Sequence, residues 1–255
     1  MYDPADFRLD GQVAVVSGAG AGIGRAIAET FAAAGAKVMV SDLRLDAAEA
    51  VVTAIAQAGG EASAQACDVT VEDDLTALIE QTVARYGRLT ILVSNAGGGG
   101  PKPFNMPMAD FRRAFELNVF SLFRLAQLAA PEMESAGGGS ILAISSMAGE
   151  NRNQRMAAYG GAKAAVNHLV RNIAHDLGSK GIRVNAIAPG ATRTDALESV
   201  LNDEVQQRML AHTPIGRLGE PQDMANAALF LCSPAANWIS GQILTVSGGG
   251  VQELD

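Results

Sequence analysis

The stretch that decides the fold is VAVVSGAGAGIG, residues 13–24. Five β-forming residues run directly into a series of glycines, and a segment with helical periodicity follows. A tight glycine turn between a strand and a helix leaves backbone N–H groups pointing outward, and the helix dipole adds partial positive charge. The stretch therefore predicts a pyrophosphate site, although a plain glycine-rich turn would have the same composition. Ile23 breaks the spacing G-x-G-x-x-G, whereas Gly18, Gly22 and Gly24 fit G-x-x-x-G-x-G.

Strand-like and helix-like segments alternate along the rest of the chain. The strand-like runs are apolar almost throughout, as expected of strands that helices cover on both faces. The predicted strands are 13–17, 37–41, 62–68, 89–94, 140–145, 183–187 and 242–246, and the predicted helices are 23–34, 47–58, 72–86, 110–133, 159–178 and 221–232. This alternation predicts one α/β domain over residues 1–255, a Rossmann-type, doubly wound, seven-stranded parallel sheet with helices on both faces.

Two segments interrupt the alternation. Residues 97–107 are rich in Gly and Pro, and residues 188–213 begin with Pro189-Gly190 and have only a weak helical pattern. Long loops inside α/β domains are usually functional lids or sites, so we expect both segments to border a ligand.

Composition and charge exclude several classes of protein. The chain of 255 residues is 48% hydrophobic, which is typical of a globular protein, and its net charge is −8. An acidic surface repels phosphate backbones and anionic lipids, so we expect no nucleic-acid partner and no membrane attachment. The first ten residues include three Asp and no apolar run, and no stretch of about 18 apolar residues occurs, so we expect neither a signal peptide nor a membrane span. A cytoplasmic protein is the resulting prediction.

The cysteines and histidines do not form a metal site by their spacing. Cys67 and Cys232 are far apart and lie in apolar surroundings, which predicts buried, unreactive thiols. His168, His175 and His212 complete no ligand cluster with acidic residues, so no metal is expected.

Polar residues follow several of the predicted strands. Asp42 ends the second strand, 24 residues after Gly18, near the separation of about 20 at which an acid binds an adenosine ribose. A carboxylate there would accept hydrogen bonds from both ribose hydroxyls of NAD and repel the 2′-phosphate of NADP, which favours NAD. A helix cap or a solvated turn is the alternative role for Asp42, and the nearby Arg44 could neutralise a phosphate. Asp68-Val69 and Asn95 close the next two strands, where ligand binding and turn formation are both plausible roles.

A pair of titratable residues begins a later helix. Tyr159 and Lys163 are spaced i, i+4, which places both side chains on one helical face. A nearby ammonium lowers the pKa of a tyrosine by stabilising the phenolate, so the pair could act as general acid and base. Ser146, just past the fifth strand, could hold a carbonyl oxygen. A buried tyrosine beside an exposed lysine, and a turn serine, are the alternatives.

Together these residues resemble the short-chain dehydrogenase/reductase family. The glycine turn, Asn95-Ala96-Gly97, Asn118, Ser146, Tyr159 with Lys163, and Pro189-Gly190 occur in the order and spacing of that family along essentially the whole chain. Ser94 stands where the family usually has Asn, and Gly160-Gly161-Ala162 fills the positions where a Ser often precedes the Lys. Neither departure removes a catalytic group.

The resemblance implies a role for each residue. Tyr159 would exchange the proton of an alcohol/ketone couple, Lys163 would lower the pKa of the tyrosine, Ser146 would hold the substrate oxygen, and Asn118 would support a proton-relaying water. The implied NAD contacts are Gly18, Gly22, Ile23, Gly24, Asp42, Leu43, Asp68, Val69, Asn95, Gly97, Tyr159, Lys163, Pro189, Gly190, Thr192 and Thr194. Hydride would pass between the nicotinamide and the carbinol carbon.

Residues 97–113 and 228–254, outside the general motifs, resemble a group within this family, the bacterial NAD-dependent hydroxysteroid dehydrogenases. That similarity implies hydride transfer at the 7α-hydroxyl or 7-oxo group of a bile acid-type steroid. Gly99, Ser146, Asn151 and Tyr159 would contact the steroid, and residues 191–213 would close over it. A 3-oxoacyl-acyl carrier protein reductase, a sugar alcohol dehydrogenase and a catalytically silent dinucleotide-binding scaffold are the alternatives.

The predicted helices 110–133 and 159–178 are apolar around much of their circumference, so each needs a second packing partner. The family resemblance implies that they pair between the subunits of a homotetramer.

Overall fold

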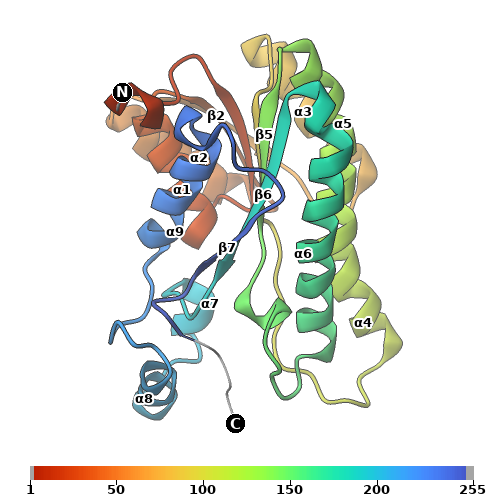
Figure 1. Cartoon of the computed structure of the whole chain (residues 1–255), viewed down its shortest axis with the longest axis vertical. Helices are drawn as coiled ribbons and strands as arrows, with labels where there is room; N and C mark the ends of the chain where they lie inside the picture. Colours follow the sequence, from red (N-terminus) through yellow and green to blue (C-terminus); the bar gives the residue numbers. More distant parts are fainter. Residues whose placement is uncertain (1–2, 251–255) are drawn as a thin grey trace.

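Seven strands lie side by side in the order β3-β2-β1-β4-β5-β6-β7, and every neighbouring pair is parallel (Figure 1). The computed structural model describes residues 3–250. The strands are β1 (Val13–Ser17), β2 (Lys37–Asp42), β3 (Glu61–Ala66), β4 (Ile91–Ser94), β5 (Gly139–Ile144), β6 (Ile182–Pro189) and β7 (Ile243–Val246). The predicted fold class is confirmed.

Helices cover both faces of this sheet (Figure 1). One face carries α1 (Gly22–Ala33), α2 (Leu45–Gln57) and α9 (Pro221–Cys232), and the other carries α3 (Glu72–Tyr86), α5 (Ser121–Ser135) and α6 (Ala157–Leu177). Two hydrophobic cores result, because successive side chains of a strand point to opposite faces. Ala14 and Val16 of β1 belong to one core, and Val15 belongs to the other.

The strand order reverses between β1 and β4. From β1 the chain builds outward through β2 and β3, then returns to place β4 on the other side of β1. Ligands of open parallel sheets bind in the crevice at the carboxyl ends of the strands at such a reversal. The glycine turn after β1 and Asn95 after β4 both lie at this point.

The predicted helix 110–133 consists of three parts. It begins as α4 (Met108–Phe115), continues as a π-helical turn, η2 (Glu116–Phe120), and ends as α5. Apolar periodicity gives the extent of such a helix, but it does not reveal one wider turn inside it. Short π-helical turns often accompany functional sites, and this one carries Asn118.

The prediction of a loop over residues 188–213 is corrected by the structure. After β6 the chain forms α7 (Asp195–Glu198) and α8 (Asp203–Ala211). Side-chain caps begin both helices, since Thr194 accepts from Leu197 N and Asn202 accepts from Val205 N. The caps were readable in the sequence, but the weak apolar periodicity obscured them.

The described part of the chain also contains four short 3-10 turns, η1 (Pro4–Phe7), η3 (Met147–Gly149), η4 (Gly178–Lys180) and η5 (Pro234–Ala236). Within residues 3–250, no helix is both long and apolar enough to cross a membrane.

Cys67 and Cys232 are buried free thiols, as predicted, and burial raises their pKa values to about 11 and about 12. Residues 251–254 of the predicted steroid-enzyme similarity lie outside the described residues.

The glycine pair at the start of α6 gives a matched prediction. A Cβ at Gly160 would lie 2.8 Å from the carbonyl oxygen of Ala148, whereas a Cβ at Gly161 would meet no atom within 4 Å. We expect Gly161→Ala to raise the free energy of unfolding by about 0.5–1 kcal/mol, because alanine loses less backbone entropy in a helix. Gly160→Ala should lower it, because α6 must move away from η3. Equal effects in urea unfolding would contradict this assignment.

Candidate active site

The glycine turn after β1 is fixed from across the strand reversal. Gly18 has a φ of +61°, and a Cβ there would lie 2.8 Å from Cα of Ala96. The amide Nδ2 of Asn95 donates to the carbonyl oxygens of Gly18 at 2.8 Å and Ser17 at 2.9 Å. A Cβ at Gly24 would collide with the same Asn95 amide and with Gly18 O. Small residues here therefore let β1, α1 and the end of β4 approach closely.

The first turn of α1 leaves its backbone donors open to a ligand. Its N-cap residue, Ala21, provides no side-chain hydrogen bond, so the first N–H groups of the helix have no partner from such a cap. Gly22 has a φ of +55°, and a Cβ there would lie 3.3 Å from Cγ2 of Thr194. Thr194, at the start of α7, thus closes over the glycine turn. A phosphate fits this arrangement of donors and helix dipole.

Asp42 lies beside this turn. Its Oδ2 accepts a hydrogen bond from Gly20 N at 2.9 Å, and its Oδ1 accepts one from Arg44 N at 3.0 Å. A Cβ at Gly20 would lie 2.9 Å from Oδ2. The spacing Gly18, Gly22 and Gly24 predicts no role for Gly20, although Gly20 belongs to the same run of glycines. Its lack of a side chain lets the Asp42 carboxylate reach the turn with lone pairs left to accept further hydrogen bonds.

Asp68, Val69 and Leu43 have different surroundings. Asp68 Oδ1 accepts from Thr70 N and Thr70 Oγ1, and these bonds hold the pKa of its carboxyl below the usual range. Val69 is buried, and Leu43 is exposed. The turn role considered for Asp68 is therefore present in the structure.

A cleft of about 540 Å³ opens at the carboxyl ends of the strands. Most predicted ligand residues line it, namely Gly22, Ile23, Asn95, Gly97, Gly99, Ser146, Tyr159, Lys163, Pro189, Gly190, Thr192 and Thr194. Gly18, Gly24, Asp42, Leu43, Asp68, Val69, Asn118 and Asn151 are not part of its lining. Arg44, which the sequence analysis considered only as a possible phosphate partner, does line the cleft.

Tyr159 and Lys163 face the cleft from the first turns of α6. The ring of Tyr159 packs on the backbone of Gly99, where a Cβ would lie 2.7 Å from Cδ2. Lys163 is only 4% exposed, and its Nζ donates to the carbonyl oxygen of Ile144 at 2.7 Å. Its Nζ lies 5.8 Å from the centroid of the Tyr159 ring. The predicted pair is therefore brought together in the cleft.

The pKa values of this pair differ from the sequence-based expectation. Burial raises the pKa of Tyr159, and a hydrogen bond with Ser146 offsets this only in part. Burial also lowers the pKa of Lys163 to about 8. Burial thus has the larger effect on Tyr159, and the Lys163 ammonium donates to Ile144 O; that Lys163 lowers the pKa of Tyr159 stays a prediction. The raised pKa favours the neutral form of Tyr159, which can donate a proton.

Asn118 fastens the loop after β4. Its Nδ2 donates to Gly98 O at 2.9 Å and to Ala114 O at 2.8 Å, and its Oδ1 accepts from Gly98 N at 3.1 Å. A Cβ at Gly97 would lie 2.8 Å from Asn118 Oδ1 and 3.3 Å from Lys163 Nζ. The π-helical turn therefore places Asn118 directly behind the loop that borders Lys163.

Asn167 is a site residue that the sequence analysis missed. It is buried one helical turn after Lys163, and its Oδ1 lies 2.5 Å from the hydroxyl of Ser145. That hydroxyl is also 3.3 Å from the carbonyl oxygen of Lys163. The i, i+4, i+8 spacing of Tyr159, Lys163 and Asn167 could have revealed it. These contacts join the end of β5, and hence the neighbouring Ser146, to α6.

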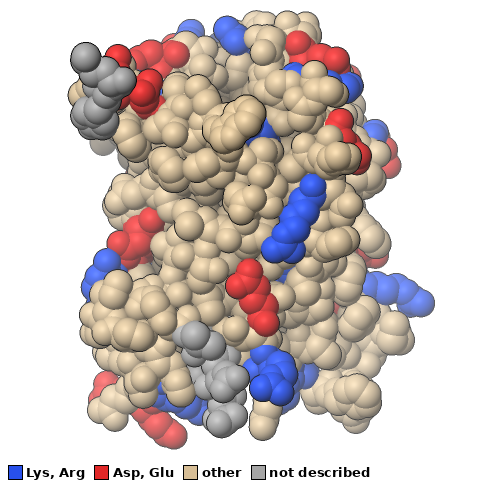
Figure 2. Space-filling model, in the orientation of Figure 1, with Lys and Arg blue, Asp and Glu red and all other residues tan. Residues whose placement is uncertain are grey.

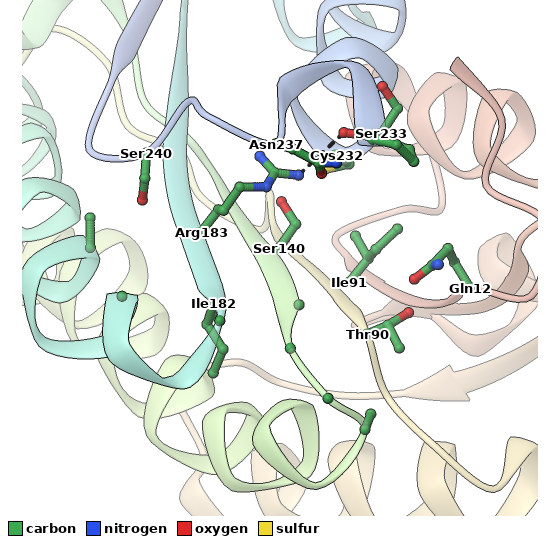
Figure 3. Close-up of a pocket in the computed structure, with 18 of the residues that line it drawn as sticks. Gln12, Thr90, Ile91, Ser140, Ile182, Arg183, Cys232, Ser233, Asn237 and Ser240 are labelled. Atoms are coloured by element: carbon green, nitrogen blue, oxygen red, sulfur yellow. Dashed lines mark hydrogen bonds between the residues drawn. The ribbon is translucent and has the colours of Figure 1, made fainter. Parts of the chain in front are cut away.

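Another cavity, of about 630 Å³, lies at the amino ends of the central strands, at the opposite end of the sheet from the cleft. Figure 3 shows its lining residues. Arg183 Nη1 donates to Leu231 O at 2.7 Å, and Nη2 donates to Ser233 O at 3.4 Å. The guanidinium therefore caps the C-terminal end of α9. Among residues 3–250, no group of three or more His, Cys, Asp or Glu side chains is placed to hold a metal ion. The cleft at the carboxyl ends thus holds the candidate catalytic groups.

Comparison with known families agrees with this geometry. A family model described as "Enoyl-(Acyl carrier protein) reductase" matches residues 18–250. The fold, the glycine turn and the Ser146–Tyr159–Lys163 cluster are those of an oxidoreductase that binds a dinucleotide. The chain belongs to the short-chain dehydrogenase/reductase family.

Among individual proteins, the chain is similar to several hydroxysteroid dehydrogenases. The chain is 65% identical to 7α-hydroxysteroid dehydrogenase of Escherichia coli strain K12 over 255 residues, which is 100% of both chains. A solved 7α-hydroxysteroid dehydrogenase complexed with NADH and 7-oxo glycochenodeoxycholic acid has a TM-score of 0.98 at 65% identity, with 100% of both chains covered. A 3α-hydroxysteroid dehydrogenase of Mediterraneibacter gnavus is 37% identical, covering 94% of this chain and 97% of the relative.

Proposed function

We propose that this protein transfers a hydride between NAD and the 7α-hydroxyl or 7-oxo group of a bile acid-type steroid. The observation that carries the proposal is its likeness, over the full length at 65% identity, to a 7α-hydroxysteroid dehydrogenase solved with NADH and a 7-oxo bile acid. The cleft supplies the necessary proton-transferring groups. A silent scaffold would not need them, and a carrier-protein or sugar substrate has no comparable support.

The residues of the cleft fit NAD. The open N-terminal end of α1 suits the pyrophosphate, and the Asp42 carboxylate suits the adenosine ribose. Four further residues of the cleft lining would contact the cofactor, namely Pro189, Gly190, Thr192 and Thr194, and Lys163 would bind the nicotinamide ribose. When bound, the cofactor supplies the carbon centre that accepts or donates the hydride.

The side chains of this protein handle the proton and the substrate oxygen. During ketone reduction, Tyr159 Oη donates its proton to the C7 oxygen, and it takes a proton back when the alcohol is oxidised. Ser146 Oγ accepts a hydrogen bond from Ala148 N at 3.1 Å, and its own proton can be donated to the same substrate oxygen. Lys163 places a positive charge beside the ring, and Asn118 supports the proton path behind it. Gly99 and Asn151 contact the steroid.

The choice of cofactor is tested by Asp42→Ala. Loss of the carboxylate removes hydrogen bonds to the ribose and the repulsion of a 2′-phosphate. We expect the ratio of kcat/KM for NAD to that for NADP to fall by about ten- to hundredfold. Asp46→Ala, which removes an exposed acid from the first turn of α2, is the matched control. If the wild type already uses both cofactors equally, the ribose assignment is wrong.

The substrate is tested with two bile acids. Cholic acid carries a 7α-hydroxyl, and deoxycholic acid does not. With NAD⁺ present, we expect NADH to form with cholic acid alone, measured by its absorbance. Formation of NADH with both acids at equal rates, or with neither, overturns the proposed function.

A homotetramer is part of this proposal. Phe120 and Phe123, at the junction of η2 and α5, expose their rings, and Trp238 and Leu244 are exposed beside and on the edge strand β7. Two separate apolar faces support two interfaces, as in a dihedral tetramer. Sedimentation should give a mass about four times the 26.3 kDa of the chain, and a single monomer peak would count against it.

The predicted cytoplasmic location also stays a proposal, which the two free buried thiols support.

A further inference from the structure

A third cavity, of about 800 Å³, surrounds the N-terminal end of α6. Three segments that border the cleft continue into its walls. Lys102 and Phe104 follow Gly99, residues 148–149 and 151–157 follow Ser146, and Gly160 follows Tyr159. We propose that this cavity binds the anionic tail of the substrate, the carboxylate end of the bile-acid side chain. The inference rests on the proposed function, since it concerns the far end of the same steroid.

The walls of this cavity are basic. Lys102, Arg152 and Arg155 line it, and no Asp or Glu of the described chain is among the lining residues. This is unusual in a protein with a net charge of −8. In Figure 2, basic and acidic side chains are scattered over the face in view, and one group of basic atoms lies near its lower end. Lys102 forms an ion pair with Asp110, with 3.2 Å between Nζ and Oδ2. Arg155 is therefore the cation that we expect to bind a ligand.

The backbone around Arg155 is held in an uncommon conformation. Within residues 3–250, Arg155 is the only non-glycine residue with a positive φ, +61°. Its carbonyl oxygen accepts a hydrogen bond from Lys102 N at 2.7 Å, which joins the loop after β4 to the loop before α6. Such strain costs about 1–2 kcal/mol and persists where the surroundings impose it, commonly at ligand-binding positions.

Asn151 adds an unused donor. Its Nδ2 is buried without a hydrogen-bond partner, and the residue lines this cavity rather than the cleft. A buried amide donor is costly unless a ligand or water completes it. Together with the basic side chains, the cavity offers hydrogen-bond donors, which fits an anion such as a carboxylate.

The apolar part of the lining fits the rest of a bile-acid side chain. Phe104 is 96% exposed at the rim, and Met156 and Ala157 contribute further apolar surface. Gly149, Gly160 and Gly161 leave the floor without side chains. An aliphatic chain that ends in a carboxylate would therefore find apolar contact first and positive charge at its end.

The test compares cholate with its uncharged methyl ester. We expect Arg155→Gln to lower kcat/KM for cholate by about fivefold, mainly through KM, which is the range of an exposed ion pair. The value for methyl cholate should stay within about a factor of two. Arg155→Lys should restore most of the loss, because it keeps the charge. Both variants retain a Cβ, so the backbone strain at position 155 is the same in each.

Arg85→Gln, which removes an exposed charge from the last turn of α3, controls for the change in net charge. If Arg155→Gln lowers kcat/KM equally for both substrates, or changes neither, the tail site is wrong while the proposed function stands. If the wild type oxidises neither cholate nor its ester, the proposed function is overturned and the tail site with it.

Discussion

Replacing Tyr159 with Phe is expected to lower kcat for 7α-hydroxyl oxidation by about a thousandfold, because the variant lacks the only atom that exchanges the substrate proton. The ring still packs on Gly99, so the shape of the cleft is kept. Binding of NADH, followed by its fluorescence, should therefore change by less than about threefold. Steady-state kinetics with cholic acid measures the loss.

The chain offers a matched control for this variant. Tyr86, in α3, donates its hydroxyl proton to Ser63 Oγ at 2.8 Å, away from the cleft. Tyr86→Phe removes the same atom from a tyrosine that takes no part in the chemistry, so its kcat should equal that of the wild type. Substantial turnover by the Tyr159→Phe protein would remove the proton donor from the proposed mechanism.

Replacing Lys163 with Met is expected to change both catalysis and the pH dependence of stability. Burial lowers the pKa of Lys163 to about 8, against 10.5 in the unfolded chain. Below pH 8 both states hold the proton, and the folded state bears the full cost of a buried ammonium. Between pH 8 and 10.5 the folded state releases it first, so the wild type gains stability as pH rises. The gain is on the order of 3 kcal/mol.

The Lys163→Met protein has no such group and should lack this gain. It also leaves Ile144 O without its donor, so the comparison uses the pH slope rather than stability at one pH. Urea unfolding of both proteins at pH 7 and pH 10 measures the difference. Parallel pH profiles would mean that the lysine is not buried as an ammonium. We also expect kcat to fall, because the charge beside Tyr159 is lost.

The sheet and most of its helices could be predicted from the sequence because their apolar patterns are strong. The third strand was predicted at 62–68 but lies at Glu61–Ala66. Its residues are mostly small, so the sequence pattern does not mark clearly where the strand begins and ends. The helices α7 and α8 were missed because polar residues dominate them, and their stability depends on caps. Nothing in the structure explains Ser94.

The candidate site shows a similar division. Four features were found because the residues of each motif lie close together in the sequence, namely Ser146, Tyr159, Lys163 and the glycine turn. The partners that place them come from distant segments, and no spacing joins Asn167 to Ser145 or Gly20 to Asp42. The effect of burial on the pKa of Tyr159 could not be predicted from spacing, because burial is a property of the folded chain. Asn151 was predicted to contact the steroid together with residues of the cleft, but it lines the neighbouring cavity.

The approach of Thr194 to Gly22 has a kinetic consequence. Thr194 begins α7, so a dinucleotide bound at the glycine turn would also fix the position of α7 and of α8 after it. We therefore expect a compulsory order of addition, with the nucleotide arriving first and leaving last. Product-inhibition patterns would then show NADH competing with NAD⁺, and the 7-oxo steroid unable to do so.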